Sequence, residues 1–226
     1  MTTGRWRVIV AGATGLVGRQ VVQALADDAR VGEVRALVRA GRPTMGADPA
    51  WPPGVRPCPV DWMQLDAAGD VLAADAVVCA LGTTIRDAGS RAAFRRVDHD
   101  HVLALARLAR GRGARAFGVV SAIGADAGSR FFYNRVKGEM EAGLRAMDWP
   151  HLVIARPSLL LGQRRQFRLG EELARRLGWL MPASSRPVQA ADVARALVAQ
   201  TLAGLQRPQG VCVLSNRLLR QGPGPG

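Results

Sequence analysis

Short apolar runs alternate along the chain with longer segments whose apolar residues recur at helical spacing. The run from Trp6 to Ala11 is rich in β-branched residues, and Val21, Val22 and Leu25 follow it on what would be one face of a helix. A second apolar run covers Val34 to Arg39. The first forty residues therefore predict a strand, a helix and a second strand.

The same alternation continues along the chain. Further strands are predicted over residues 55–60, 75–81, 116–121, 151–155 and 210–214, and helices over residues 92–110, 131–147, 166–177 and 190–202. Pro57 and Pro59 place the strand 55–60 at a sheet edge, because proline cannot donate a hydrogen bond to a central ladder. The predicted fold class is α/β, a doubly wound parallel sheet of the Rossmann type, in one domain over residues 1–220. Residues 221–226, rich in glycine and proline, are predicted to form a disordered tail.

Three glycines lie between the first strand and the first helix. Gly12, Gly15 and Gly18 have the spacing GxxGxxG, which is typical of a turn that binds the pyrophosphate of a dinucleotide. A side chain at these positions would keep the backbone from the phosphates or the helix from the strand. The first amides of the helix would face the anion. The residues of this turn predicted to bind a cofactor are Gly12, Thr14, Gly15, Leu16, Val17 and Gly18.

Arg39 ends the second strand, where an acidic residue normally binds the 2′-hydroxyl of NAD. A guanidinium can instead bind the 2′-phosphate of NADP through two parallel hydrogen bonds. NADP (NADPH) is thus the predicted cofactor, with Arg42 as an assisting residue. The alternative is that Arg39 is one more surface arginine.

The ends of the third and fourth strands would meet the glycine turn at one edge of the sheet, where ligands of such sheets bind. Asp61 and Trp62 follow the third strand and are predicted to bind the cofactor, with Asp61 at the adenine. Leu81, Gly82 and Thr83 at the end of the fourth strand are also predicted to bind it, with Gly82 and Thr83 at the pyrophosphate and ribose. Asp and Gly are also ordinary turn residues, so a purely structural role stays open.

Tyr133 and Lys137 are the only tyrosine and the only lysine of the chain. Four residues apart on a predicted helix, they share one face. A neighbouring ammonium and a nicotinium ring would stabilise the phenolate and lower the pKa of Tyr133, which would then exchange a proton with a carbonyl or an alcohol. Lys137 would also hold the nicotinamide ribose. The alternative is a helix with an incidental tyrosine and lysine.

Four segments carry a resemblance to a known family. GATGLVG at 12–18, VSAIGAD at 120–126, YNRVK at 133–137 and ARPSLLLG at 155–162 are similar to the short-chain dehydrogenase/reductase superfamily, and more narrowly to its atypical branch of NAD(P)H-binding proteins related to the Tat-interacting oxidoreductase-like protein. The resemblance implies an NADPH-dependent oxidoreductase acting on a small or medium carbonyl compound. It also implies that Arg156 and Pro157 begin a substrate-side loop, with Pro157 near the cofactor, and that Asp192 opens a late helix near it.

One position departs from the family pattern. Active members usually place a hydrogen-bonding serine or threonine as the second of a Ser-Ser pair after the fifth strand, where this chain has Ser121-Ala122. Ser121 is predicted as the third catalytic residue and as a cofactor contact, and Ser129 is the alternative partner of the substrate oxygen. The departure keeps a second hypothesis open, in which the chain is a catalytically weak or inactive NADPH sensor that acts through a protein partner.

The charge of the chain raises a further class of partner. The formal net charge is +13, and 30 of the 31 basic residues are arginines scattered along the sequence. We interpret this as a solvated basic surface, with nucleic-acid binding as a hypothesis that rests on charge alone. The expected partners are a dinucleotide and an unidentified small-molecule substrate, with no membrane, and the chain is expected to be a monomer or a homodimer.

The positions of the cysteines and histidines and the first residues of the chain argue against disulfide-bonded, metal-binding and secreted proteins. Cys58, Cys79 and Cys212 are far apart and suggest neither a disulfide framework nor a zinc site. His99 and His101 are two residues apart on a helix and would not share a face, which argues against a metal pair, and His151 begins a strand. The few residues before Trp6 leave no room for a secretory signal, and a cytoplasmic location is expected.

Overall fold

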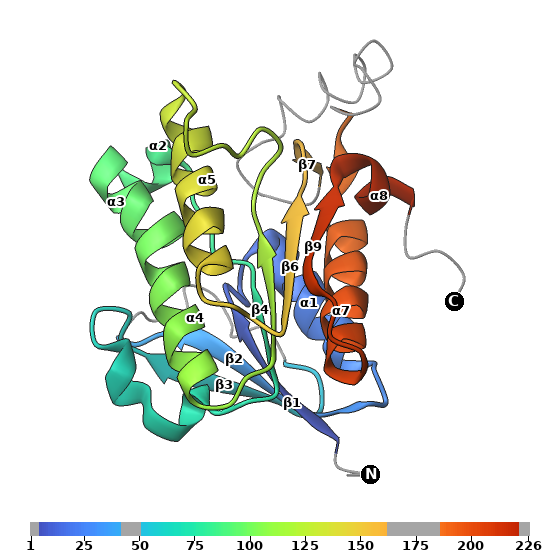
Figure 1. Ribbon diagram of the computed structural model, residues 1–226. Helices are drawn as coiled ribbons and strands as arrows, with labels where there is room; N and C mark the ends of the chain where they lie inside the picture. Colours follow the sequence, from blue (N-terminus) through green and yellow to red (C-terminus); the bar gives the residue numbers. More distant parts are fainter. Residues whose placement is uncertain (1–4, 42–50, 162–185, 222–226) are drawn as a thin grey trace.

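The computed structural model describes residues 5–41, 51–161 and 186–221. Its centre is a sheet of seven parallel strands in the order β3-β2-β1-β4-β5-β6-β9 (Figure 1). The strands are β1 (Trp6–Ala11), β2 (Val31–Arg39), β3 (Val55–Val60), β4 (Ala76–Cys79), β5 (Ala116–Val120), β6 (His151–Arg156) and β9 (Gly210–Ser215). The predicted Rossmann-type sheet is confirmed, and β3 lies at an edge as its two prolines indicated. A separate pair joins β7 (Leu160–Leu161) to β8 (Val188–Gln189).

Helices cover both faces of the sheet (Figure 1). α1 (Leu16–Ala26) and α7 (Ala190–Gln206) pack side by side on one face, and α4 (His101–Gly111) and α5 (Phe132–Arg145) cover the other. The shorter elements are η1 (Leu65–Leu72), α2 (Ile85–Ala88), α3 (Arg91–Arg95), η2 (Arg96–Asp100) and α8 (Asn216–Gln221). The helix predicted over residues 166–177 lies outside the described residues. Gln221, assigned to the predicted tail, is the last residue of α8, and the rest of that tail is outside the described residues.

The helix predicted over residues 92–110 is the one that differs most in detail. It consists of α3, the π-helical turn η2 and α4, which follow one another without a break. Such turns insert an i→i+5 hydrogen bond into an α-helix and are frequent at functional sites. The sequence pattern gave no sign of η2, because a single wider turn hardly disturbs the apolar period.

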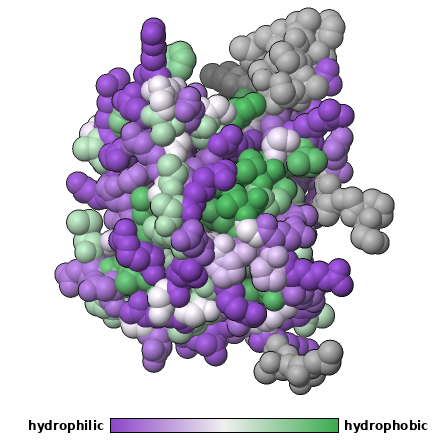
Figure 2. Space-filling view, viewed as in Figure 1, coloured by the Kyte–Doolittle hydropathy of each residue, from purple (hydrophilic) through white to green (hydrophobic). Residues whose placement is uncertain are grey.

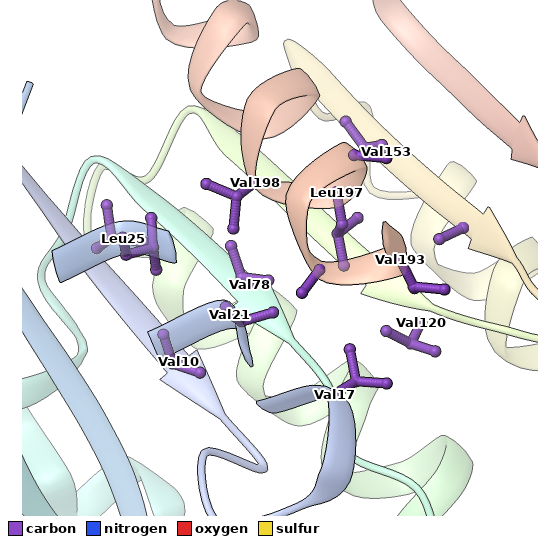
Figure 3. Close-up of a cluster of buried hydrophobic side chains, with 14 of the residues drawn as sticks. Val10, Val17, Val21, Leu25, Val78, Val120, Val153, Val193, Leu197 and Val198 are labelled. Atoms are coloured by element: carbon purple, nitrogen blue, oxygen red, sulfur yellow. The ribbon is translucent and has the colours of Figure 1, made fainter. Parts of the chain in front are cut away.

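Two apolar layers hold the helices to the sheet. Figure 3 shows the layer under α1 and α7, where Val10, Val78 and Val153 of the strands face Leu25 of α1 and Leu197 of α7. All five side chains are fully buried, and burying each one contributes about 1.5–3 kcal/mol relative to exposure. The second layer lies between the sheet and α4 and α5. The two layers cover the faces of the sheet, and the carboxyl ends of the strands are left for a site.

The glycine turn after β1 depends on missing side chains. Gly12 has φ +75°, and a Cβ there would lie 2.5 Å from the carbonyl oxygen of Ala80. A Cβ on Gly18 would lie 1.9 Å from the carbonyl oxygen of Gly12. The turn can therefore lie against α1 and against the end of β4 only because both positions are glycine.

Polar residues dominate the face of the molecule in Figure 2, with an apolar group near its middle, over β6 and β9. The exposed apolar side chains of β9 are Val211 and Val213, on the strand that forms the sheet edge opposite β3. Within residues 5–41, 51–161 and 186–221, no helix combines the length and apolar character needed to cross a bilayer.

Candidate functional site

A pocket of about 940 Å³ opens at the carboxyl ends of β1, β2, β3 and β4. Residues predicted from four separate chain segments line it together: Gly12, Thr14, Gly15, Arg39, Asp61, Trp62, Leu81, Gly82 and Thr83. The parallel sheet brings the four strand ends to one edge, which explains why segments up to seventy residues apart meet there. Arg96 and His101, which the sequence reasoning did not assign to a site, also line the pocket.

Gly15, which precedes α1, lines this pocket, whereas Leu16, Val17 and Gly18 are not among its lining residues. Gly15 is the residue that caps the helix, and it supplies no side-chain hydrogen bond to the first turn. The first turn, Leu16 to Gly18, holds no acidic residue, and the side chain of Val17 packs in the core (Figure 3). Leu16, Val17 and Gly18 can thus act only through their amides, which at a helix start suit an anion. The turn fits the pyrophosphate of a dinucleotide, because bare backbone surrounds it.

At the β2 and β3 end of the pocket, Trp62 packs against His101, with ring centroids 5.5 Å apart. Asp61 closes a turn by accepting a hydrogen bond from the Met63 amide at 2.8 Å. Arg39 is exposed at the end of β2, and Arg42 lies outside the described residues. Burial lowers the pKa of His101, Asp100 opposes that change, and the positive charges of Arg96 and Arg39 add to it.

A buried ion pair lies behind Gly82 and Thr83. Asp98, in the π-helical turn, accepts a hydrogen bond from the Thr83 amide at 2.9 Å, and its second oxygen lies 2.8 Å from Nζ of Lys137. The side chains of Asp98 and Lys137 are only 1% and 4% exposed. The sequence held a sign of this pair, because Asp98 occupies the apolar helix face between Phe94 and Val102, where a carboxylate needs a partner.

The buried pair changes the expected chemistry of Tyr133. Burial raises the pKa of Tyr133, and the charge of Asp98 adds to the rise, while Lys137 opposes both. Burial alone would lower the pKa of Lys137, but Asp98 and Tyr133 outweigh it and the pKa is raised. Lys137 thus acts on the pKa of Tyr133 in the predicted direction, but burial of the phenol, which the sequence did not show, raises the pKa by more. Lys137 is charged, but Asp98 offsets its effect on the phenol.

Tyr133 and Lys137 come from α5 and stand beside the pocket without being among its lining residues. The ring of Tyr133 packs on that of Phe94 with centroids 5.5 Å apart, and 38% of the residue is exposed. Gly138 allows this placement, because a Cβ there would lie 2.2 Å from the Ala127 nitrogen in the loop after β5.

Ser121 belongs to a second buried network. Its hydroxyl donates to Oε1 of Glu141 at 2.5 Å, and Arg156 binds both oxygens of the same carboxylate, at 3.0 and 2.5 Å. The hydrogen bond to Glu141 raises the pKa of the Arg156 guanidinium. With its proton directed to Glu141, Ser121 has only lone pairs to offer another group. Ser129, the alternative, accepts a hydrogen bond from the Phe131 amide at 3.2 Å.

Other residues singled out in the sequence lie away from the pocket. The carbonyl of Pro157 accepts a hydrogen bond from the Ile123 amide, and Asp192 pairs with Arg195 on α7. His99 contacts Asp100, and His151 is buried under α7. In the part of the chain that the structure describes, no cluster of three or more His, Cys, Asp or Glu side chains is arranged to hold a metal ion.

Comparison with known proteins gives the pocket a context. Residues 12–203 match the model of a family described as NAD(P)H-binding. The protein FMP52 of Eremothecium gossypii, named mitochondrial, is 35% identical over 171 residues, which cover 72% of this chain and 70% of that protein. The protein HTATIP2 of Rattus norvegicus is 40% identical over 143 residues, which cover 62% of this chain and 59% of that protein.

Solved structures agree with the fold. The enzyme WbmG of Bordetella bronchiseptica, in complex with NAD, matches with a TM-score of 0.70 at 17% identity, covering 94% of this chain and 73% of that one. The oxidoreductase ylbE of Lactococcus lactis matches with a TM-score of 0.65 at 15% identity and covers 95% of both chains.

The relatives correct the expected location. FMP52 proteins of Eremothecium gossypii, Candida albicans and Saccharomyces cerevisiae, 29–35% identical to this chain, are named mitochondrial. The cytoplasmic location inferred from the first residues is therefore wrong as stated, because the lack of a secretory pattern does not distinguish the cytoplasm from an organelle.

Proposed function

Because this chain belongs to the NAD(P)H-binding family, we propose that it is an NADPH-dependent oxidoreductase that reduces a small or medium carbonyl substrate. The observation that carries the proposal is the pocket at the carboxyl edge of the sheet, where the glycine turn, Arg39 and the ends of β3 and β4 meet. A bound NADPH supplies the hydride for such a reaction. The protein's part is to bind the nucleotide, position the carbonyl and provide a proton.

Different residues around the pocket bind different parts of the nucleotide. The amides of Leu16 to Gly18 bind the pyrophosphate, Asp61 and Trp62 border the adenine, and Gly82 with Thr83 borders the ribose. Arg39 binds the 2′-phosphate, since its guanidinium is exposed at the end of β2 and a carboxylate there would repel that group.

The protonation state of Tyr133 favours reduction of a carbonyl over oxidation of an alcohol. Its pKa is raised above the ordinary value, so the phenol keeps its proton at neutral pH and can donate it to the carbonyl oxygen as the hydride arrives. Lys137 is held by Asp98 beside Tyr133, and the hydrogens of its ammonium that do not face Asp98 would bind the nicotinamide ribose.

A second candidate is an NADPH-binding regulatory protein without significant turnover. The observation in its favour is the Ser121–Glu141–Arg156 network together with Ala122, because the hydroxyl that would steady a substrate oxygen donates to a buried carboxylate. Both candidates bind NADPH, and they differ in turnover.

Nucleotide affinity tests the shared part of both candidates. Calorimetric titration of the wild-type protein should give tighter binding of NADPH than of NADH. Arg39→Ala should weaken NADPH binding about 10- to 100-fold, the equivalent of one or two charge-assisted hydrogen bonds, and leave NADH nearly unchanged. Equal affinities of the wild-type protein for both nucleotides would contradict the role of Arg39.

Turnover separates the candidates. With a panel of aldehydes and ketones, Tyr133→Phe should lower kcat about 10²- to 10⁴-fold, the usual contribution of a general acid, with NADPH affinity within twofold of wild type. Unchanged turnover in Tyr133→Phe would remove Tyr133 from the chemistry. A wild-type protein that binds NADPH tightly but reduces none of the panel would favour the regulatory candidate.

A further inference from the structure

The π-helical turn η2 brings Arg96 and His101 to the same pocket. The amide of His101 donates to the carbonyl of Arg96, an i→i+5 bond. In a regular α-helix these two residues would be about 140° apart around the axis, but the wider turn lets both line the pocket. Between them in the chain, Asp98 binds Lys137 and the amide of Thr83, which also lines the pocket. The π-helical turn therefore positions Asp98 for its ion pair with Lys137 and also places Arg96 and His101 at the pocket.

Arg96 and Arg39 line the same pocket. The two arginines come from different elements, η2 and the end of β2, yet both line the pocket and both influence the imidazole of His101. Their guanidinium groups form no ion pair and no side-chain hydrogen bond within the residues that the structure describes. Two exposed guanidinium groups that line one pocket make its potential more positive, and a bound anion would be attracted to both.

The acidic residues of the pocket lining are Asp61 and Asp87. Asp100 lies beside His101 in the chain and contacts Nδ1 of His99 at 2.7 Å. Asp61 uses one oxygen for the Met63 amide. The arginines of the pocket lining are Arg39 and Arg96, and His101, whose pKa burial lowers, packs against the Trp62 ring.

We propose that Arg96 is a specificity-determining residue that binds the 2′-phosphate of NADPH together with Arg39. The inference rests on the proposed function and deepens it. A 2′-phosphate carries nearly two negative charges and three acceptor oxygens, enough for two guanidinium groups at once. NADH has a hydroxyl at that position and leaves both cations unrelieved.

Paired titrations of NADPH and NADH against Arg96→Gln, Arg39→Gln and the double variant test the proposal. Arg96→Gln should weaken NADPH binding about tenfold and change NADH binding less than twofold, as expected for a lost charge-assisted contact. The shorter probes 2′,5′-ADP and 5′-AMP should show the same difference. Arg96→Lys, which keeps the charge but not the fork, should lose less than Arg96→Gln. Arg107→Gln, an exposed arginine on α4 outside the pocket lining, is the matched control and should leave both affinities unchanged.

The outcomes separate this inference from the proposed function. A wild-type protein that prefers NADPH, with the preference unaltered in Arg96→Gln, overturns the role of Arg96 and leaves the function standing. Equal losses of NADPH and NADH in Arg96→Gln also overturn it, because they would place the guanidinium on the pyrophosphate. A wild-type protein that binds neither nucleotide overturns both proposals.

Discussion

The buried pair of Asp98 and Lys137 gives a prediction that can be worked out in numbers. At 2.8 Å the Coulomb attraction is about 6 kcal/mol at an effective dielectric constant of about 20, an upper bound because desolvation opposes it. Breaking a buried pair by removing one partner costs about 3–5 kcal/mol, since a buried charge is left alone. Lys137→Met, which replaces the side chain by an unbranched apolar one that is one atom shorter, should therefore lower the melting temperature by about 6–20 °C for a chain of this size.

Two comparisons make the stability test specific. Arg145→Met removes an exposed cation from the same helix and should cost less than about 1 kcal/mol. Adding Asp98→Asn to Lys137→Met should recover part of the loss, because the asparagine oxygen still accepts from the Thr83 amide and the lone charge is gone. Losses that simply add, or a Lys137→Met variant as stable as the control, would refute the reasoning.

The same variant has a spectroscopic readout. Tyr133 is the only tyrosine, so the ultraviolet absorbance change on phenol ionisation reports one group. Lys137 opposes the rise in the pKa of Tyr133 and Asp98 adds to it, so Lys137→Met should move the titration to higher pH. A titration at unchanged pH would mean that the ammonium does not act on the phenol.

Three further outcomes are expected. Gly18→Ala should abolish NADPH binding or the fold, because its Cβ would meet backbone, whereas Gly111→Ala, with open space around it, should be neutral in the same calorimetric assays. Burial lowers the pKa of His151 below about 6.5, so the contribution of His151 to stability is full above that pH and is lost as pH falls toward the lowered pKa. His151→Gln should therefore reduce the fall in melting temperature between neutral and acid pH, and an unchanged fall would contradict the assignment. Glu141→Gln should lower the melting temperature by several degrees, since it disrupts a buried network, and a change below 1 °C would show that the bonds to Ser121 contribute little.

The elements with a strong local pattern were predictable from the sequence. β1 and β3 have the predicted bounds, and the edge position of β3 followed from its prolines. The glycine turn was equally readable, because only glycine fits where Gly12 and Gly18 meet backbone. These features depend on residues close together in the sequence, or on a residue type such as glycine or proline whose backbone properties no other residue shares.

The parts of the site that escaped prediction depend on contacts between distant segments. The Asp98–Lys137 pair joins η2 to α5, and the Ser121–Glu141 bond joins β5 to α5. The spacing of His101 to His99 argued only against a metal pair and gave no other role, whereas in the structure the π-helical turn brings His101 and Arg96 to the pocket. No periodicity of one helix could have shown these partners.

A crystal structure of the protein soaked in NADPH tests the central claim most directly. The account predicts the dinucleotide in the pocket of about 940 Å³, with its pyrophosphate on the amides of Leu16 to Gly18 and its nicotinamide beside the Tyr133 hydroxyl. A nucleotide bound elsewhere, or a pocket without nucleotide at a concentration that saturates the protein in solution, would contradict it.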